Sequence, residues 1–246
     1  MARVRSRTQR ISTAPCLNPK GGANFSRWSV AGAGGKRDDG GRVPGKIAPR
    51  VTVYAHGEAP PLVGDGEIAL AQLEALPRRT AVFGDGSHAT TRLCAAAVDW
   101  FCGRRKLRAV LDVGTGTGIL ARIARARGAS DIVATDIDPA ALDSAAAHAA
   151  LDEREVEIQL SSELPDHWGP RFDLVVANIL EEPLRGLAPC LVRALRPGGG
   201  VLLVSGFTRP QAPGMRLAYE RLGVTFVGAS DLEEWTLLIF SADSAS

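Results

Sequence analysis

The chain has 246 residues, a mass of 25.9 kDa, 45% apolar residues and a formal net charge of +2. This length fits one domain of roughly 150 to 200 residues with an extension, and the apolar content suffices for a packed core. No run of about 18 apolar residues exists, and the four cysteines form no CxxC pair, so we expect no membrane segment and no metal site. Such cysteine usage suggests a reducing, cytoplasmic compartment.

Positive charge is concentrated in the first part of the chain. Residues 1–50 hold eleven Lys or Arg against two acids, whereas the rest holds eighteen basic and twenty-five acidic residues. Residues 21–45 include eight glycines and show no apolar periodicity. A disordered or non-native tail, an organellar transit peptide and a nucleic-acid-binding arm remain open interpretations. For the folded part we expect no nucleic-acid partner.

Composition predicts three regions. Residues 1–46 form a basic leader expected to be disordered, and residues 47–80 form a short segment with a strand and a helix. Residues 81–241 form the main domain. That domain starts at the stretch "FGDGSHATT", residues 83–91, which precedes a helical run at 92–102.

Strands and helices alternate from residue 108 onward. A buried strand is expected over 108–113, followed by a helix that ends at Gly128. In that helix the spacing turns Ile119, Leu120, Ile123 and Ala124 inward and places Arg122, Arg125 and Arg127 in solvent. The next strand covers 131–136, and the next helix begins at Asp138 as cap with Pro139 at its first position.

The remaining pattern continues to the end of the chain. It predicts strands over 155–161, 172–178 and 201–207, helices over 181–199 and 210–222, and two final strands over 224–228 and 234–240. Repeated βα units require a parallel sheet with right-handed crossovers. The short connection between the last two strands predicts an antiparallel edge pair. The fold class is therefore α/β, a Rossmann-like, doubly wound and mostly parallel seven-stranded sheet.

The turn after the first strand of this series is rich in glycine. It reads Asp-x-Gly-x-Gly-x-Gly, with Asp112, Gly114, Gly116 and Gly118, and we predict that these four residues bind a cofactor. A nicotinamide-dinucleotide fingerprint would need a glycine where Ile119 stands, and a P-loop would need Gly-Lys-Ser/Thr. The observed pattern is typical of methyltransferases that use S-adenosylmethionine (AdoMet). In such sheets the ligand lies beyond the carboxyl ends of the strands, where Asp136 can accept hydrogen bonds from a ribose.

Several motifs together give a more specific resemblance. In order, the sequence contains "AVFGDGSHATTRLC", "VLDVGTGTGILARIA", "DIDPAALDSA", "FDLVVANIL", "PLRGLAP", "LVSGF" and "EEW". Over roughly residues 81–240 the chain resembles the bacterial ribosomal-protein methyltransferases of the PrmA family. The resemblance implies a class I methyltransferase fold and AdoMet as cofactor. It also implies methylation of lysine ε-amines and an N-terminal α-amine on a ribosomal protein.

The same resemblance indicates site residues. Thr91, Gly114, Asp136 and Asn178 match AdoMet contacts of the family, and Phe83 and His88 lie in a loop that covers the cofactor. Asn178 also matches the residue that orients the acceptor amine, and it is the catalytic candidate. The family carries a separate N-terminal substrate-binding domain that the roughly eighty residues before the loop do not supply. Two alternatives for the methyl acceptor therefore remain: a small-molecule amine and a protein outside the ribosome. A third alternative is that the chain is a non-catalytic AdoMet-binding or RNA-associated protein.

Overall fold

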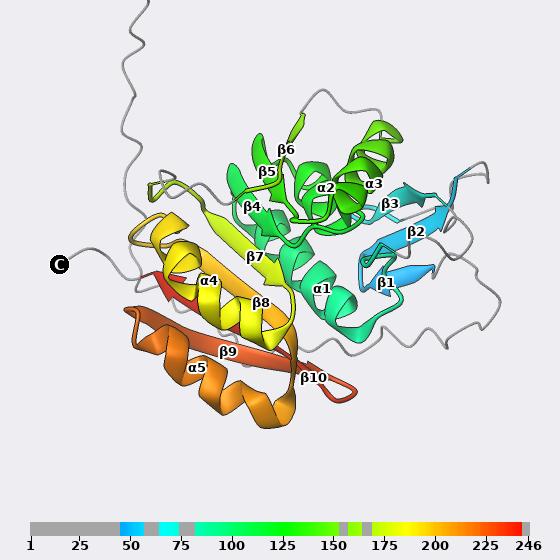
Figure 1. Cartoon of the computed structure of the whole chain (residues 1–246). Coiled ribbons are helices and arrows are strands. Elements are labelled where there is room, and N and C mark those ends of the chain that lie inside the picture. Colours follow the sequence, from blue (N-terminus) through cyan, green and yellow to red (C-terminus); the bar gives the residue numbers. More distant parts are fainter. Residues whose placement is uncertain (1–44, 57–63, 74–81, 153–156, 164–168, 243–246) are drawn as a thin grey trace, which may run out of the picture.

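The main body of the protein is a seven-stranded sheet between two layers of helices (Figure 1). A computed structural model describes residues 45–56, 64–73, 82–152, 157–163 and 169–242. Within these residues the strand order is β6-β5-β4-β7-β8-β10-β9. Their bounds are β4 Ala109–Val113, β5 Asp131–Thr135, β6 Ile158–Ser161, β7 Leu174–Asn178, β8 Val201–Thr208, β9 Val224–Leu232 and β10 Trp235–Ala242. The predicted fold class is confirmed.

The helices divide between the two faces of the sheet. One face packs against α1 (Ala89–Arg104) and α2 (Ile119–Ala126), with α3 (Pro139–Ala150) beside α2. The other face packs against α4 (Glu181–Ala194) and α5 (Ala212–Glu220), which is preceded by the short helix η2 (Arg209–Gln211). Both faces are buried, which explains why the central strands read as continuous apolar runs. None of the described helices is both long and apolar enough to cross a lipid bilayer.

The last two strands form the antiparallel edge that the sequence predicts. β10 pairs with β8 on one side and with β9 on the other, both antiparallel. β9 extends to Leu232, so the expected connection shrinks to a turn at Glu233 and Glu234. Glu233 has a φ of 56°, a left-handed conformation that such a tight turn requires.

A small separate sheet precedes the main domain, where the sequence suggested a strand and a helix. β1 (Lys46–Ala48) pairs antiparallel with β2 (Val51–Ala55), and β2 pairs parallel with β3 (Ile68–Gln72). The described residues of this segment form three strands and no helix, with β3 over residues 68–72. Figure 1 shows this sheet beside α1, on the side away from α4 and α5. The expected leader lies almost wholly outside the described residues.

Two arginines of α2 contradict the prediction that they face solvent. Arg122 is fully buried and Arg125 is 6% exposed, and both bind the carboxylate of Asp152. Arg122 also donates a hydrogen bond of 2.6 Å to the carbonyl of Ala71 in β3. Burial raises the pKa of Asp152, but the two guanidinium groups more than offset this and hold the pKa below its usual range. This cluster therefore joins α2, the end of α3 and the small sheet.

Removing the shared carboxylate should destabilise the fold. In Asp152→Asn the two buried guanidinium groups lose their counter-charge, and we expect the free energy of unfolding to fall by about 3 kcal/mol. Urea unfolding followed by circular dichroism measures this change. Asp143→Asn removes an exposed acid of α3 and should alter stability by less than about 0.5 kcal/mol. Equal stability of the two variants would contradict a structural role for the cluster.

Candidate functional site

The glycine-rich turn after β4 is held against other chain segments. Gly114 and Gly116 adopt φ of 71° and 55°, a left-handed conformation that favours glycine. A Cβ on Gly114 would lie 2.1 Å from the Cγ2 of Ile179, and one on Gly116 would lie 2.0 Å from the carbonyl oxygen of Phe83. These glycines are therefore required because protein atoms approach the turn from two sides.

The segment "FGDGSH", residues 83–88, lies on this turn. The backbone N–H of Thr117 donates to the carbonyl of Phe83 at 3.0 Å, and the Thr117 hydroxyl donates to the carbonyl of Gly84 at 2.5 Å. Asp85 accepts from the backbone and the hydroxyl of Ser87 at 2.9 and 2.7 Å, which fixes a local turn. Residues 83–88 are therefore fixed against the glycine-rich turn and form one wall of the site, and we refer to them as the wall.

His88 connects this segment to α1 and to β10. Its side chain caps α1 by accepting from the backbone N–H of Thr90 at 3.3 Å. The imidazole also packs edge-on against Phe83 and Trp235, with ring centroids 5.1 and 4.8 Å away. These contacts account for His88 as a residue that positions the wall.

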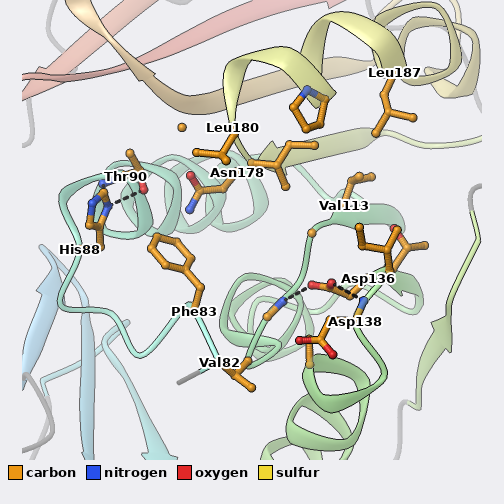
Figure 2. Close-up of a pocket in the computed structure, with 18 of the residues that line it drawn as sticks. Val82, Phe83, His88, Thr90, Val113, Asp136, Asp138, Asn178, Leu180 and Leu187 are labelled. Atoms are coloured by element: carbon orange, nitrogen blue, oxygen red, sulfur yellow. Dashed lines mark hydrogen bonds between the residues drawn. The ribbon is translucent and has the colours of Figure 1, made fainter. Parts of the chain in front are cut away.

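A pocket of about 870 Å³ opens between this wall and the carboxyl ends of β4, β5 and β7. Figure 2 shows its labelled polar side chains in two groups, with Asp136 and Asp138 at one end and His88, Thr90 and Asn178 at the other. The lining is otherwise mainly apolar. It includes Val82, Phe83, Val113, Ile137, Ile179, Leu180, Pro183, Leu187 and Trp235. This volume is in the range of small-molecule sites.

The acidic end is built around Asp136, which follows β5. Its carboxylate accepts from the backbone N–H of Gly116 at 3.0 Å and of Asp138 at 3.1 Å. Each carboxylate oxygen retains a lone pair, so the group can also accept hydroxyl donors from a ligand. Asp138 caps α3 by accepting from Ala140 at 2.9 Å, as predicted. Between the two acids Ile137 is 93% exposed, an apolar side chain that our sequence reasoning missed.

The other end is built around Asn178, the last residue of β7. It is 8% exposed and lines the pocket, and its side-chain oxygen is buried without a hydrogen-bond partner among the described residues. An unpaired buried acceptor costs about 1–3 kcal/mol, so a donor on a bound ligand would recover that free energy. The next residues, Ile179 and Leu180, add apolar lining.

The predicted site residues separate into two sets. Phe83, Gly114, Gly116, Asp136 and Asn178 all line the pocket. Thr91, Asp112 and Gly118 do not: Thr90 takes the pocket position beside Thr91, and Gly118 packs against Ala145 of α3. A direct ligand contact by Thr91 stays a prediction. Among the described residues no group of three or more acids, histidines and cysteines could hold a metal ion.

Asp112, near the end of β4, holds the glycine-rich turn by hydrogen bonds on the side away from the pocket. One carboxylate oxygen accepts from the Thr115 hydroxyl at 2.7 Å and from the backbone N–H of Ala121 at 3.2 Å. Complete burial raises the pKa of this carboxyl to about 6, and the charge of Asp136 adds to the rise. Asp112 thus shapes the turn without facing the pocket.

A family model and individual relatives of known name point to the same protein family. Residues 44–243 match the family described as "Ribosomal protein L11 methyltransferase (PrmA)". Proteins named ribosomal protein L11 methyltransferase are 44% identical in Methylobacillus flagellatus over 139 residues and 39% in Myxococcus xanthus over 153 residues. These matches cover 56% and 62% of this chain but 45% and 52% of the relatives. The chain thus spans about half the length of the curated relatives it matches.

Solved structures agree with the sequence comparison. A ribosomal protein L11 methylase from Lactobacillus delbrueckii subsp. bulgaricus superposes with a TM-score of 0.70 and 29% identity. The superposition covers 81% of this chain and 98% of that structure. An RNA methyltransferase-like protein from Pyrococcus horikoshii, at 15% identity and a TM-score of 0.52, shares the fold.

Substitution at Gly116 tests the close approach of wall and turn. In Gly116→Ala the added methyl meets the carbonyl of Phe83 and the backbone must keep a positive φ, so we expect a loss of stability of about 2 kcal/mol or more. Ligand binding in the pocket should weaken with it. Gly186→Ala is the matched control, because Gly186 lies in α4 with nothing within 4 Å of the added methyl. Thermal unfolding and ligand titration measure both variants. Stability and affinity of Gly116→Ala equal to those of Gly186→Ala would contradict this role of Gly116.

The buried Asp112 predicts a specific pH dependence of stability. Its pKa is raised in the folded state, so between pH 4 and 6 the folded protein binds more protons than the unfolded chain, and stability falls as pH rises. The full effect is about 3 kcal/mol, at roughly 1.4 kcal/mol per pKa unit. In Asp112→Asn this component should vanish. Urea unfolding at several pH values, compared between the two proteins, should therefore diverge across this window; parallel curves would refute the assignment.

Proposed function

We propose that this chain, which belongs to the ribosomal protein L11 methyltransferase (PrmA) family, transfers methyl groups from AdoMet to an amine nitrogen of a protein. The family match covers residues 44–243 and includes every residue of the pocket. The single observation that carries the proposal is the unpaired, buried side-chain oxygen of Asn178 in an apolar pocket. We further propose that the acceptor is a lysine or N-terminal amine of a ribosomal protein, which implies a cytoplasmic enzyme.

The pocket residues fit AdoMet. The carboxylate of Asp136 is within the pocket and can accept ribose hydroxyls, and Ile137 offers an exposed apolar surface for a flat base. A volume of about 870 Å³ accommodates a nucleoside with an amino-acid arm and leaves room for an acceptor side chain. Phe83 and the wall it belongs to would cover the bound molecule.

Once bound, AdoMet supplies an electrophilic methyl group on a sulfonium. The remaining work belongs to the chain itself, and it consists mainly of alignment in a site from which water is excluded. The side-chain oxygen of Asn178 would accept a hydrogen bond from the acceptor amine and aim the nitrogen lone pair. Leu180, 71% exposed at the start of α4, gives the aliphatic stem of a lysine an apolar surface to cross.

The acceptor must lose a proton before it attacks. A free lysine has a pKa near 10.4, and both the apolar lining and a neighbouring positive charge lower that pKa. We assign no general base among the titratable residues of the described pocket lining: His88 caps α1, and Asp136 and Asp138 accept backbone N–H groups at the acidic end. Glu163 also lines the pocket, and it follows β6, the strand next to β5, so it belongs to the acidic end as well. We therefore propose that desolvation and the positive charge of the cofactor lower the pKa of the amine, which gives its proton to bulk water as it enters the site.

Asn178→Ala tests the proposal. We expect the turnover number for methyl transfer to fall by about 100-fold, because the amine is no longer aligned, whereas the dissociation constant for AdoMet changes by less than about tenfold. Isothermal titration gives the affinity, and labelled AdoMet with purified ribosomal protein gives the turnover. Unchanged turnover would contradict the role of Asn178.

The acceptor is tested in the same assay. Radiolabel should appear on the ribosomal protein, and amino-acid analysis should recover it as methylated lysine or a methylated N-terminal residue. The Gly186→Ala variant leaves the pocket intact and serves as the control for substitution as such. Label only on small amines, with none on protein, would replace the protein acceptor with a small-molecule one. AdoMet binding without any transfer would indicate a non-catalytic protein.

A further inference from the structure

We infer that the surface at the amino ends of the parallel strands, opposite the pocket, binds the phosphate backbone of a nucleic acid, for which single-stranded RNA serves as the probe. The feature that carries this inference is a group of six cationic side chains, which we term the basic edge. It comprises Arg104, Arg105, Lys106, Arg108, Arg171 and Arg196. The first four are exposed within one short stretch of sequence, and the last two are 40% and 53% exposed.

The basic edge comes from the last residue of α1, Arg104, and from three loops that the fold brings together. They precede β4, β7 and β8, and these parallel strands start at the same side of the sheet. Backbone hydrogen bonds join the loops: the N–H of Asp173 donates to the carbonyl of Ala109 at 2.8 Å, and the N–H of Arg196 donates to the carbonyl of Phe172 at 2.8 Å. The cations are therefore presented by a rigid scaffold.

The charge on this edge is poorly compensated. Two acids, Asp131 and Asp173, lie among the loops, and each already holds an arginine, Arg171 and Arg196 respectively. Asp173 also accepts from the backbone N–H groups of Arg108 and Ala109. No carboxylate in the described part of the chain pairs with Arg104, Arg105, Lys106 or Arg108. A surplus of four positive charges remains, although the chain beyond residue 50 is net negative.

The chemistry of the surface favours a nucleic acid over a membrane or an apolar protein partner. The exposed large apolar side chains of the described residues are Phe83, Ile137, Leu180, Leu217 and Leu222, none of which belongs to these loops. An apolar anchor for lipid insertion or for a protein hot spot is thus missing here. Five of the six cations are arginines, whose planar guanidinium groups bind phosphate in a bidentate manner. This conclusion differs from our expectation from sequence, where only the leader suggested nucleic acid.

The position of the basic edge separates it from the pocket. The pocket lies at the carboxyl ends of β4, β5 and β7, and the basic edge at the amino ends of the parallel strands. A bound RNA would leave the pocket open, so both sites can be occupied together. The inference does not depend on the proposed methyl transfer, but an acceptor protein carried on RNA would engage both sites at once.

The test is a titration of labelled RNA with the full chain. The probe is a fluorescent 20-nucleotide single-stranded RNA, and the variant is the triple substitution Arg105→Gln, Lys106→Gln and Arg108→Gln. We expect its dissociation constant at 100 mM salt to rise at least about tenfold, and the slope of log affinity against log salt to fall by about 2. The control removes three exposed arginines elsewhere, Arg209→Gln, Arg216→Gln and Arg221→Gln, and should bind nearly like the original chain.

Far-ultraviolet circular dichroism and thermal unfolding of both triple variants show that each remains folded, whether or not the chain binds AdoMet. Equal loss of RNA affinity in the two variants would overturn the inference, because net charge alone would explain it. Absence of RNA binding by the original chain would overturn it as well. Binding to vesicles with 30% anionic lipid, lost in the basic-edge variant while RNA binding persists, would assign the edge to membranes instead.

Discussion

The site depends on the close approach of three chain segments at one glycine-rich turn. The wall touches Gly116 through the carbonyl of Phe83, and Ile179 touches Gly114 from the other side. Ile179 in turn sits on Gly206, where a Cβ would lie 2.0 Å from its carbonyl oxygen. Each contact is possible because a side chain is missing. The glycine-rich turn that borders the pocket is therefore fixed in place by the carbonyl of Phe83 on one side and the side chain of Ile179 on the other.

Two sets of buried polar side chains in this fold differ in how they are paired. The guanidinium groups of Arg122 and Arg125 are buried with a counter-charge, and they tie the small sheet to the main body. Asn178 is buried with its side-chain oxygen unpaired. The first arrangement neutralises its buried charges within the chain and is structural, although one guanidinium nitrogen of Arg122 has no hydrogen-bond partner among the described residues. The second leaves an acceptor for a partner that is not part of the chain, as expected of a binding site.

Local patterns predicted most of the main sheet, and long-range contacts explain what they missed. The strands around Asp112 and Asn178 and the cap at Asp138 follow from patterns within a few residues. The burial of Arg122 depends on Asp152, thirty residues away, and on β3, fifty residues earlier. Likewise Gly116 reads as a ligand contact in sequence, but its need for glycine comes from Phe83. Thr91, Asp112 and Gly118 belong to the same motifs yet do not line the pocket, because a motif does not reveal which of its residues face inward.

Our central proposal is that Asp136 and Asn178 line the two ends of a pocket in which a methyl group passes from AdoMet to an amine of a protein. The most direct measurement is intact-mass and peptide mass spectrometry of a purified ribosomal protein after incubation with the full chain and AdoMet. We predict mass increments of whole methyl groups, located on lysine side chains or the N-terminal amine. An unmodified ribosomal protein, or methyl groups on oxygen or carbon atoms alone, would contradict the account.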